Sequence, residues 1–177
     1  MIEKGKPEAL YADGVTVPSG AAIYKTAGTG PKDLNPTAPE GTPERYIDAG
    51  LLANGKLPSG VTITEAQAIN ALEQIRANLR SRGLKLSDVI AMRAFLAKPP
   101  GADKVDFAGW NRAYRQFFAN TNLDTGATLL VPLGTGTPTQ PIEHNPTRPT
   151  RSTLEVSLVV PGWLVEIEVD ALVPSRK

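Results

Sequence analysis

The sequence predicts an α+β fold in which two helices cover one face of a mostly antiparallel sheet. Three observations indicate it: apolar residues recur at helical spacing after residue 64, aromatic residues do so after Asp106, and apolar and acidic residues alternate near the C-terminus. The predicted order of elements is β-β-α-β-α-β-β. The 177 residues are enough for one domain, residues 1–177, with a single sizeable core.

The first predicted element is a β-hairpin over residues 14–26. Val15 and Val17 precede a turn at residues 18–20, and a short apolar run ending at Tyr24 follows it. Two apolar segments joined by a turn that contains Pro and Gly are typical of paired strands.

The first predicted helix comes next. Thr64 and Gln67 have the spacing of a capping box, and Gly83 is suited to end a helix. The apolar residues that recur at helical spacing between these signals are Ile69, Leu72, Ile75 and Leu79. Residues 89–96 follow and are rich in branched and aromatic side chains, which predicts a buried strand.

The second predicted helix begins after Asp106, whose side chain is suited to cap it. Its predicted apolar face consists of Phe107, Trp110, Ala113 or Tyr114, and Phe117. Packing in the core explains these residues without a further role. Because one strand precedes this helix and another follows it, we expect a β-α-β crossover.

Two strands are predicted at the C-terminus, over residues 151–158 and from residue 163 onward, joined by a turn at Pro161 and Gly162. The face without helices is predicted to bear Thr153, Glu155, Glu166 and Glu168. This polar face is either exposed to solvent or covered by another surface.

Arg151 and Glu166 are a cation and a carboxylate with direct chemical uses. A guanidinium binds a substrate carboxylate through two parallel hydrogen bonds. A carboxylate nearby orients or deprotonates a water and returns a proton to a leaving nitrogen. A hairpin that turns near Pro161 would place Arg151 opposite Asp170, far from Glu166. The two side chains would then meet only across subunits.

The composition argues against several classes of partner. Lys and Arg number 19 and Asp and Glu 18, so the net charge of +1 gives no general attraction to nucleic acid or to an acidic membrane. The absence of cysteine excludes disulfides and thiolate metal ligands, and the acidic residues lack calcium-loop spacing, so no metal is predicted. The single histidine, His144, lies in a predicted loop, which argues against a Ser-His-Asp triad.

Glycine and proline concentrate in residues 28–60 and 122–149, which we expect to be long loops inserted in the domain. No apolar run approaches the roughly 20 residues of a membrane-spanning helix. We therefore expect a soluble protein, either cytoplasmic or, where a leader peptide has been removed, periplasmic or secreted.

Several segments resemble the RidA/YjgF family. Residues 149–156 (PTRSTLEV) and 165–169 (VEIEV) resemble its C-terminal signature, PxRSxxEV followed by IEIEA. Residues 106–118 (DFAGWNRAYRQFF) are similar to its DFxxxNxxYxxFF helix, and residues 84–95 to its GLxLxDVVKxTVF segment. With Tyr11 near the N-terminus, the resemblance covers most of the chain outside the two loops.

The resemblance implies a chorismate-mutase-like fold and a homotrimer with a barrel-like centre and clefts between subunits. It implies hydrolysis of reactive enamine and imine intermediates, such as 2-aminoacrylate, to 2-keto acids and ammonia without a metal or organic cofactor. By position, Arg151 matches the carboxylate clamp and Glu166 the acid that handles water. The further substrate-binding positions are matched by Tyr11, Ala27, Gly28, Asn111 and Thr153.

One segment departs from the family pattern. Where members often read TSGQ, residues 26–29 read TAGT, so the methyl group of Ala27 replaces a cleft hydroxyl. Either Thr29 supplies the hydroxyl or the substrate differs. The preferred hypothesis is an imine deaminase, and the alternative is a trimer of the same fold that binds small carboxylates without turning them over. RNA cleavage is a weaker third hypothesis, because the net charge is near zero and basic residues are not clustered.

Overall fold

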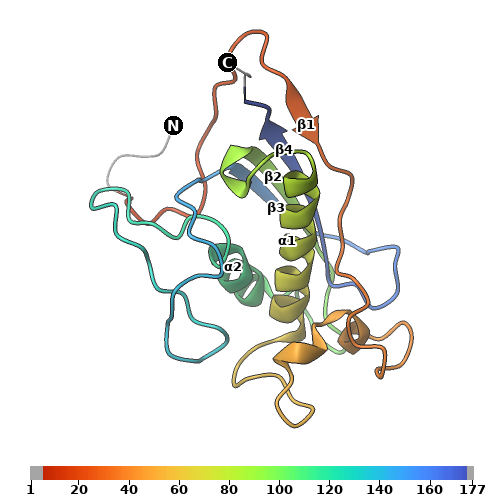
Figure 1. Cartoon of the computed structure of the whole chain (residues 1–177). Helices are drawn as coiled ribbons and strands as arrows, with labels where there is room; N and C mark the ends of the chain where they lie inside the picture. Colours follow the sequence, from red (N-terminus) through yellow and green to blue (C-terminus); the bar gives the residue numbers. More distant parts are fainter. Residues whose placement is uncertain (1–5, 175–177) are drawn as a thin grey trace.

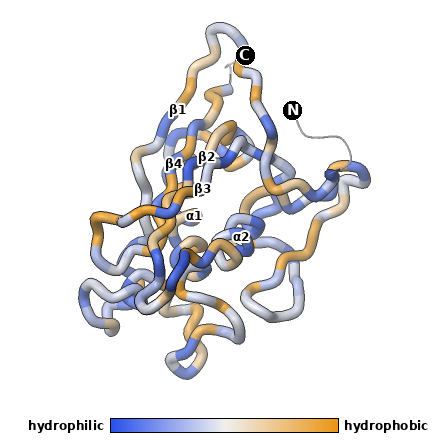
Figure 2. Tube along the Cα trace, turned by 180° about the vertical axis from the view of Figure 1, so that it is seen from behind, coloured by the Kyte–Doolittle hydropathy of each residue, from blue (hydrophilic) through white to orange (hydrophobic). Residues whose placement is uncertain are grey.

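The computed structural model describes residues 6–174. Its α-helices and strands, in chain order, are β1 (Ile23–Lys25), α1 (Ile63–Ser81), β2 (Val89–Leu96), α2 (Phe107–Arg115), β3 (Thr150–Glu155) and β4 (Val165–Leu172), and short 3-10 helices are formed at Pro43–Tyr46, Ala49–Leu51 and Leu86–Asp88. The strands form one sheet in the order β1-β4-β2-β3, in which only β2 and β3 run parallel. Both α-helices lie on one side of this sheet (Figure 1), and Figure 2 views the molecule from behind. The predicted α+β class and the crossover from β2 through α2 to β3 are confirmed.

The core lies between the sheet and the helices. Strands β2 and β4 turn alternate side chains toward α1, which contributes the apolar stripe predicted from its spacing. The buried apolar residues of these three elements include Ile69, Leu72, Ile75, Leu79, Val89, Met92, Ala94, Leu96, Val165, Ile167, Val169 and Ala171. Within residues 6–174, no helix is long and apolar enough to cross a membrane.

The predicted hairpin over residues 14–26 is wrong. Only Ile23–Lys25 form a strand, and this strand pairs antiparallel with β4. The predicted turn is present, because the Ala21 N–H donates to the Pro18 carbonyl at 3.2 Å. The side chains of Val15 and Val17 are 41% and 37% exposed, so they do not pack into the core as a paired strand would require.

The N-cap of helix α1 lies two residues before the predicted cap. Thr62, not Thr64, is the N-cap, and its Oγ1 accepts a hydrogen bond from the Glu65 N–H at 3.1 Å. Thr64 is buried inside the helix. At the other end the prediction holds: Gly83 has a φ of +72°, and the following N–H of Leu84 donates to the Leu79 carbonyl.

Two buried amide side chains on α1 hold the loop of residues 28–60. Gln67 donates to the carbonyls of Pro43 and Gly162 at 2.9 and 2.8 Å, and it accepts from the Leu164 N–H at 2.7 Å. Asn70 donates to the Lys32 carbonyl at 2.8 Å. These side chains satisfy backbone groups of this loop and of the segment that leads into β4, which explains why polar residues are buried here.

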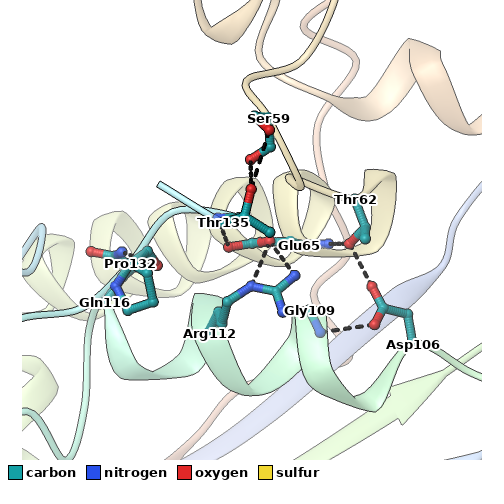
Figure 3. Close-up of polar contacts among 10 residues, drawn as sticks. Ser59, Thr62, Glu65, Asp106, Gly109, Arg112, Gln116, Pro132 and Thr135 are labelled. Carbon is teal, nitrogen blue, oxygen red and sulfur yellow. Dashed lines mark hydrogen bonds and ion pairs between the residues drawn. The ribbon is translucent and has the colours of Figure 1, made fainter. Parts of the chain in front are cut away.

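Glu65 connects α1 with α2 and with the second long loop, residues 122–149 (Figure 3). Its side chain is fully buried; one oxygen accepts two hydrogen bonds from Arg112, at 2.9 and 2.7 Å, and the other accepts the Gly134 N–H at 3.0 Å. The hydrogen bonds from Arg112 to this carboxylate raise the pKa of the guanidinium. Glu65 is three residues after the Thr62 N-cap, where a glutamate can accept a hydrogen bond from the N-cap N–H. Here its carboxylate makes tertiary contacts with Arg112 and Gly134 instead.

Helix α2 begins as predicted. Asp106 caps it by accepting the Gly109 N–H at 2.8 Å, and a second Asp106 oxygen accepts from the Thr62 hydroxyl. Trp110, Ala113, Tyr114 and Phe117 are fully buried, but Phe107 is 49% exposed, so its assignment to the buried face is wrong. Phe107 is the first residue of the helix and lies beside the edge strand β3, where no described segment covers it.

The C-terminal strands are formed, but they do not pair with each other. Strand β2 lies between them, so Arg151 is level with Met92 and does not face Asp170. The prediction that all four polar residues lie on the helix-free face is therefore only half correct. Thr153 and Glu155 share the register of β2 residues that face the helices, whereas Glu166 and Glu168 lie on the opposite side.

Replacement of Glu65 by alanine leaves the Arg112 guanidinium without its carboxylate in a largely buried position. Breaking such a pair costs about 3–5 kcal/mol of unfolding free energy. Urea denaturation of Glu65→Ala is the measurement. Glu73→Ala on the same helix, which removes a more exposed ion pair with Arg76, is the control and should cost less than about 1 kcal/mol. Equal losses in both variants would show that the Glu65 network adds no stability.

Candidate substrate-binding site

Arg151 lies on the helix side of β3, among aromatic side chains. Its Nη2 donates to Oδ1 of Asn111 on α2 at 2.8 Å. Its guanidinium carbon is 4.6 Å from the Tyr114 ring centroid and 5.8 Å from that of Trp110, both buried. The rings of Tyr11 and Phe107 are 5.5 and 6.0 Å away and are about half exposed. Cation–π contacts of this kind stabilise a charge that has lost part of its hydration.

The Arg151 charge has no carboxylate partner among residues 6–174. Its Nη1 is buried without a hydrogen-bond acceptor in that part of the chain. Burial lowers the pKa of this guanidinium. Thr153 is two residues further along the same face of β3, and its Oγ1 is also buried without a partner. The arrangement therefore offers hydrogen-bond donors and a positive charge to an anion, and a guanidinium fits a planar carboxylate.

The N-terminal segment holds Tyr11 over Arg151. The Tyr114 hydroxyl donates to the Leu10 carbonyl at 2.8 Å, and the Ala12 N–H donates to the Pro149 carbonyl at 3.2 Å. Arg148 is buried and donates only to backbone carbonyls, including that of Ala9 at 2.7 Å. Sequence reasoning missed Arg148, because no pattern distinguishes an arginine that binds carbonyls of distant segments.

Glu166 lies on the other side of the sheet, on β4. A Cβ atom at Gly28 would collide with Oε1 of Glu166, so a larger residue there would displace the Glu166 side chain. Thr29 and Ile167 exchange backbone hydrogen bonds at 2.8 and 3.0 Å, which fixes this segment beside β4. Ala27 and Gly28 are exposed. No described residue forms an ion pair or a hydrogen bond with the Glu166 carboxylate.

The predicted site residues therefore form two groups in one copy of the chain. We call Arg151, Asn111, Thr153 and Tyr11 the clamp half, and Glu166, Ala27 and Gly28 the acid half. Arg151 is level with Met92 of β2, and Glu166 is level with Phe95. This separates the two side chains by roughly 10 Å along the sheet, and they point to opposite faces. One copy alone does not bring the two halves together.

The acid half continues into a charged cluster. Arg93 contacts Glu168 at 2.7 Å and Asp170 at 3.0 Å, and Lys25 is 3.6 Å from Asp170. The hydrogen bond from Arg93 lowers the pKa of Asp170. Of the carboxylates on this face, Glu166 is thus the one that no described cation pairs with. Within the described residues, no group of three metal-ligating side chains is placed to hold a metal ion.

Comparison with known proteins identifies the family. A profile of the family described as Endoribonuclease L-PSP, which is the RidA/YjgF family, matches residues 6–173. The chain belongs to this family. A RidA/YjgF relative, the 2-iminobutanoate/2-iminopropanoate deaminase of Escherichia coli (strain K12), is 29% identical over 118 residues, or 67% of this chain and 68% of that protein. The protein of the same name from Salmonella typhimurium (strain LT2) is 28% identical over 134 residues, or 71% and 83% of the two chains.

A solved structure supports the chorismate-mutase-like fold. The crystal structure of YyfB from Yersinia pestis, a protein of unknown function in the conserved Rid family, has a TM-score of 0.52 and 18% identity. The match covers 98% of this chain and 96% of that one.

The structure bears on the departure from the RidA/YjgF pattern at residues 26–29. The Thr29 hydroxyl donates to the Ala27 carbonyl at 3.1 Å. This hydroxyl is therefore engaged with its own loop and does not replace the missing serine in this structure. Ala27 leaves the acid half without a side-chain hydroxyl at that position.

The charged cluster beside Glu166 gives a pH-dependent stability. Because the folded-state pKa of Asp170 is lowered, its contribution is present above the unfolded pKa of about 3.9 and is lost as the pH falls through the folded value. Arg93→Met should therefore be less stable than the parent at pH 7, and the difference should shrink below about pH 4. Urea denaturation from pH 7 to 3 measures it. Arg82→Met, which removes an exposed arginine that lies over the Tyr24 ring, is the control. A difference that stays constant with pH would contradict this role of Asp170.

Proposed function

We propose that this protein hydrolyses 2-imino acids, and the enamines in equilibrium with them, to 2-keto acids and ammonia. The observation that carries the proposal is the Arg151 guanidinium, which is partly desolvated, has no carboxylate partner among residues 6–174 and stands at the position that resembles the family's clamp. Membership of the RidA/YjgF family and the deaminase names of two relatives support the reaction class.

The proposed reaction needs only groups of the chain and one water. Arg151 and the Thr153 hydroxyl bind the substrate carboxylate, and Asn111 holds the guanidinium in place. Glu166 accepts a proton from the water as its oxygen attacks the imine carbon, and it passes this proton to the imine nitrogen, which gives a tetrahedral carbinolamine. Glu166 then carries the hydroxyl proton to the amino group as the C–N bond breaks, so that ammonia leaves and the carbon keeps the water oxygen as a keto group. General acid–base catalysis by such a carboxylate contributes about 10²–10⁴-fold in rate.

We place this chemistry in a cleft between copies of the chain. The clamp half and the acid half point to opposite faces of one sheet, so the Arg151 of one copy must meet the Glu166 of a neighbour. A closed ring of identical head-to-tail contacts achieves this in every cleft at once. The proposed assembly is the homotrimer that the family resemblance implies, in which the helix-free sheet faces pack together at the centre.

The alternative is a trimer that binds small carboxylates without catalysis. The methyl group of Ala27 and the engaged hydroxyl of Thr29 favour it, because the acid half then offers Glu166 alone to orient a water. RNA cleavage, which the family description names, gains no support from a net charge of +1.

The first test measures keto acid release while an amino-acid oxidase generates imino acids in situ. The parent chain should accelerate release above the buffer rate. Arg151→Ala should lower kcat/KM at least about 100-fold through loss of the charged hydrogen bonds, and Glu166→Gln should lower kcat by about 10²–10⁴-fold. The control is Glu73→Gln on α1, away from both halves and ion-paired with Arg76, with an expected change below about threefold. No acceleration by the folded parent would leave the carboxylate-binding alternative.

The second test mixes two inactive variants. If each cleft takes Arg151 from one copy and Glu166 from another, subunit exchange between Arg151→Ala and Glu166→Gln rebuilds intact clefts. In a random equimolar mixture about one cleft in four is intact, so about a quarter of the parent activity should return. Activity is compared before and after exchange under mildly dissociating conditions. If no activity returns although mass spectrometry shows mixed oligomers, the two residues do not share a cleft between copies.

A further inference from the structure

We infer that Phe107 and Tyr11 form an apolar wall that selects 2-imino acids with large apolar side chains over those with a methyl group. The inference rests on the proposed function and adds the substrate class. Phe107 is the first residue of α2, and its ring is 6.0 Å from the Arg151 guanidinium carbon. The Tyr11 ring is 5.5 Å from the same atom.

The exposure of the four rings around Arg151 divides them into two pairs. Trp110 and Tyr114 are fully buried, whereas Phe107 and Tyr11 are 49% and 48% exposed. The outer pair thus borders the approach to the guanidinium and presents aromatic surface to whatever binds there. In a 2-imino acid the first side-chain carbon is two bonds from the carboxylate carbon. A side chain of several carbons can lie against these rings, whereas a methyl group extends too little to contact both.

On the Phe107 side of this wall the charged groups are already engaged, whereas on the Tyr11 side Glu8, Asp13 and Arg115 line a pocket together with Tyr11. The Asp106 carboxylate accepts from the Gly109 N–H and the Thr62 hydroxyl, and Arg112 is bound to Glu65. A charged substrate side chain would find no free partner on the first turns of α2. In the acid half, Ala27 and Gly28 have no polar side-chain atom. Apolar contact is therefore the interaction that Phe107 and the first turns of α2 offer.

Phe107 contributes little to the core, since half of its surface is exposed. The fold does not require an aromatic ring at this position, because the helix is capped by Asp106 and held by Trp110 and Arg112. A large exposed apolar residue beside an unpaired cation is consistent with a role in binding. It also means that a truncation at Phe107 can be tested in a folded protein.

The test compares kcat/KM for imines generated in situ from leucine and phenylalanine with that for the imine from alanine. The parent should prefer the two larger imines by at least about tenfold. Phe107→Ala should remove most of that preference by lowering kcat/KM for the two larger imines at least about fivefold more than for the alanine-derived imine, and Phe107→Leu should retain the preference. Leu130→Ala, which truncates another exposed apolar residue, is the matched control. Equal kcat/KM for all imines in the parent, or an equal loss for all imines in Phe107→Ala, would overturn the inference.

Two further measurements keep the inference separate from the proposed function. Calorimetric titration with pyruvate and with the keto acid of leucine should show the same preference in Kd, even if the parent hydrolyses no imine. Size-exclusion chromatography of Phe107→Ala should show the oligomeric state of the parent. A smaller oligomer would show that Phe107 is a subunit contact and would overturn the inference.

Discussion

The site depends on where the guanidinium of Arg151 is held. The parallel pairing of β3 with β2 turns this side chain under α2, where Asn111 accepts one hydrogen bond and four aromatic rings surround the charge. No acid from residues 6–174 neutralises it. A charge that is partly desolvated and unpaired is costly to a fold, and this cost falls when an anion binds. The same arrangement thus explains why the Arg151 charge is unpaired and why this side chain is suited to bind an anion.

The position of α2 depends in turn on buried polar groups that belong to α1. Glu65 binds Arg112, the residue next to Asn111, and also the backbone of the second loop at Gly134. Gln67 and Asn70 satisfy backbone groups of the first loop. The two long loops are therefore fixed by specific hydrogen bonds to one helix. A substitution at Glu65 should therefore release Arg112 and shift the neighbouring Asn111 of the clamp half.

The separation of the clamp half from the acid half limits what one chain can do. Alternate residues of a strand point to opposite faces, and the register puts Arg151 and Glu166 on different sides of the sheet. In the proposed assembly the two halves meet only between copies of the chain, so the proposed activity is a property of the oligomer.

The sequence by itself determined the α+β class, the span of β2, the apolar stripe of α1, the cap of α2 at Asp106 and, by resemblance, the family. These features depend on local periodicity and on side chains that act within one turn of the backbone. Only the tertiary structure decided that β2 separates β3 from β4, that Thr153 faces the helices, that residues 14–17 form no strand and that Arg148 fixes the N-terminal segment. Such features depend on which segments meet across the chain, and a pattern of alternate residues is the same whichever neighbour a strand pairs with.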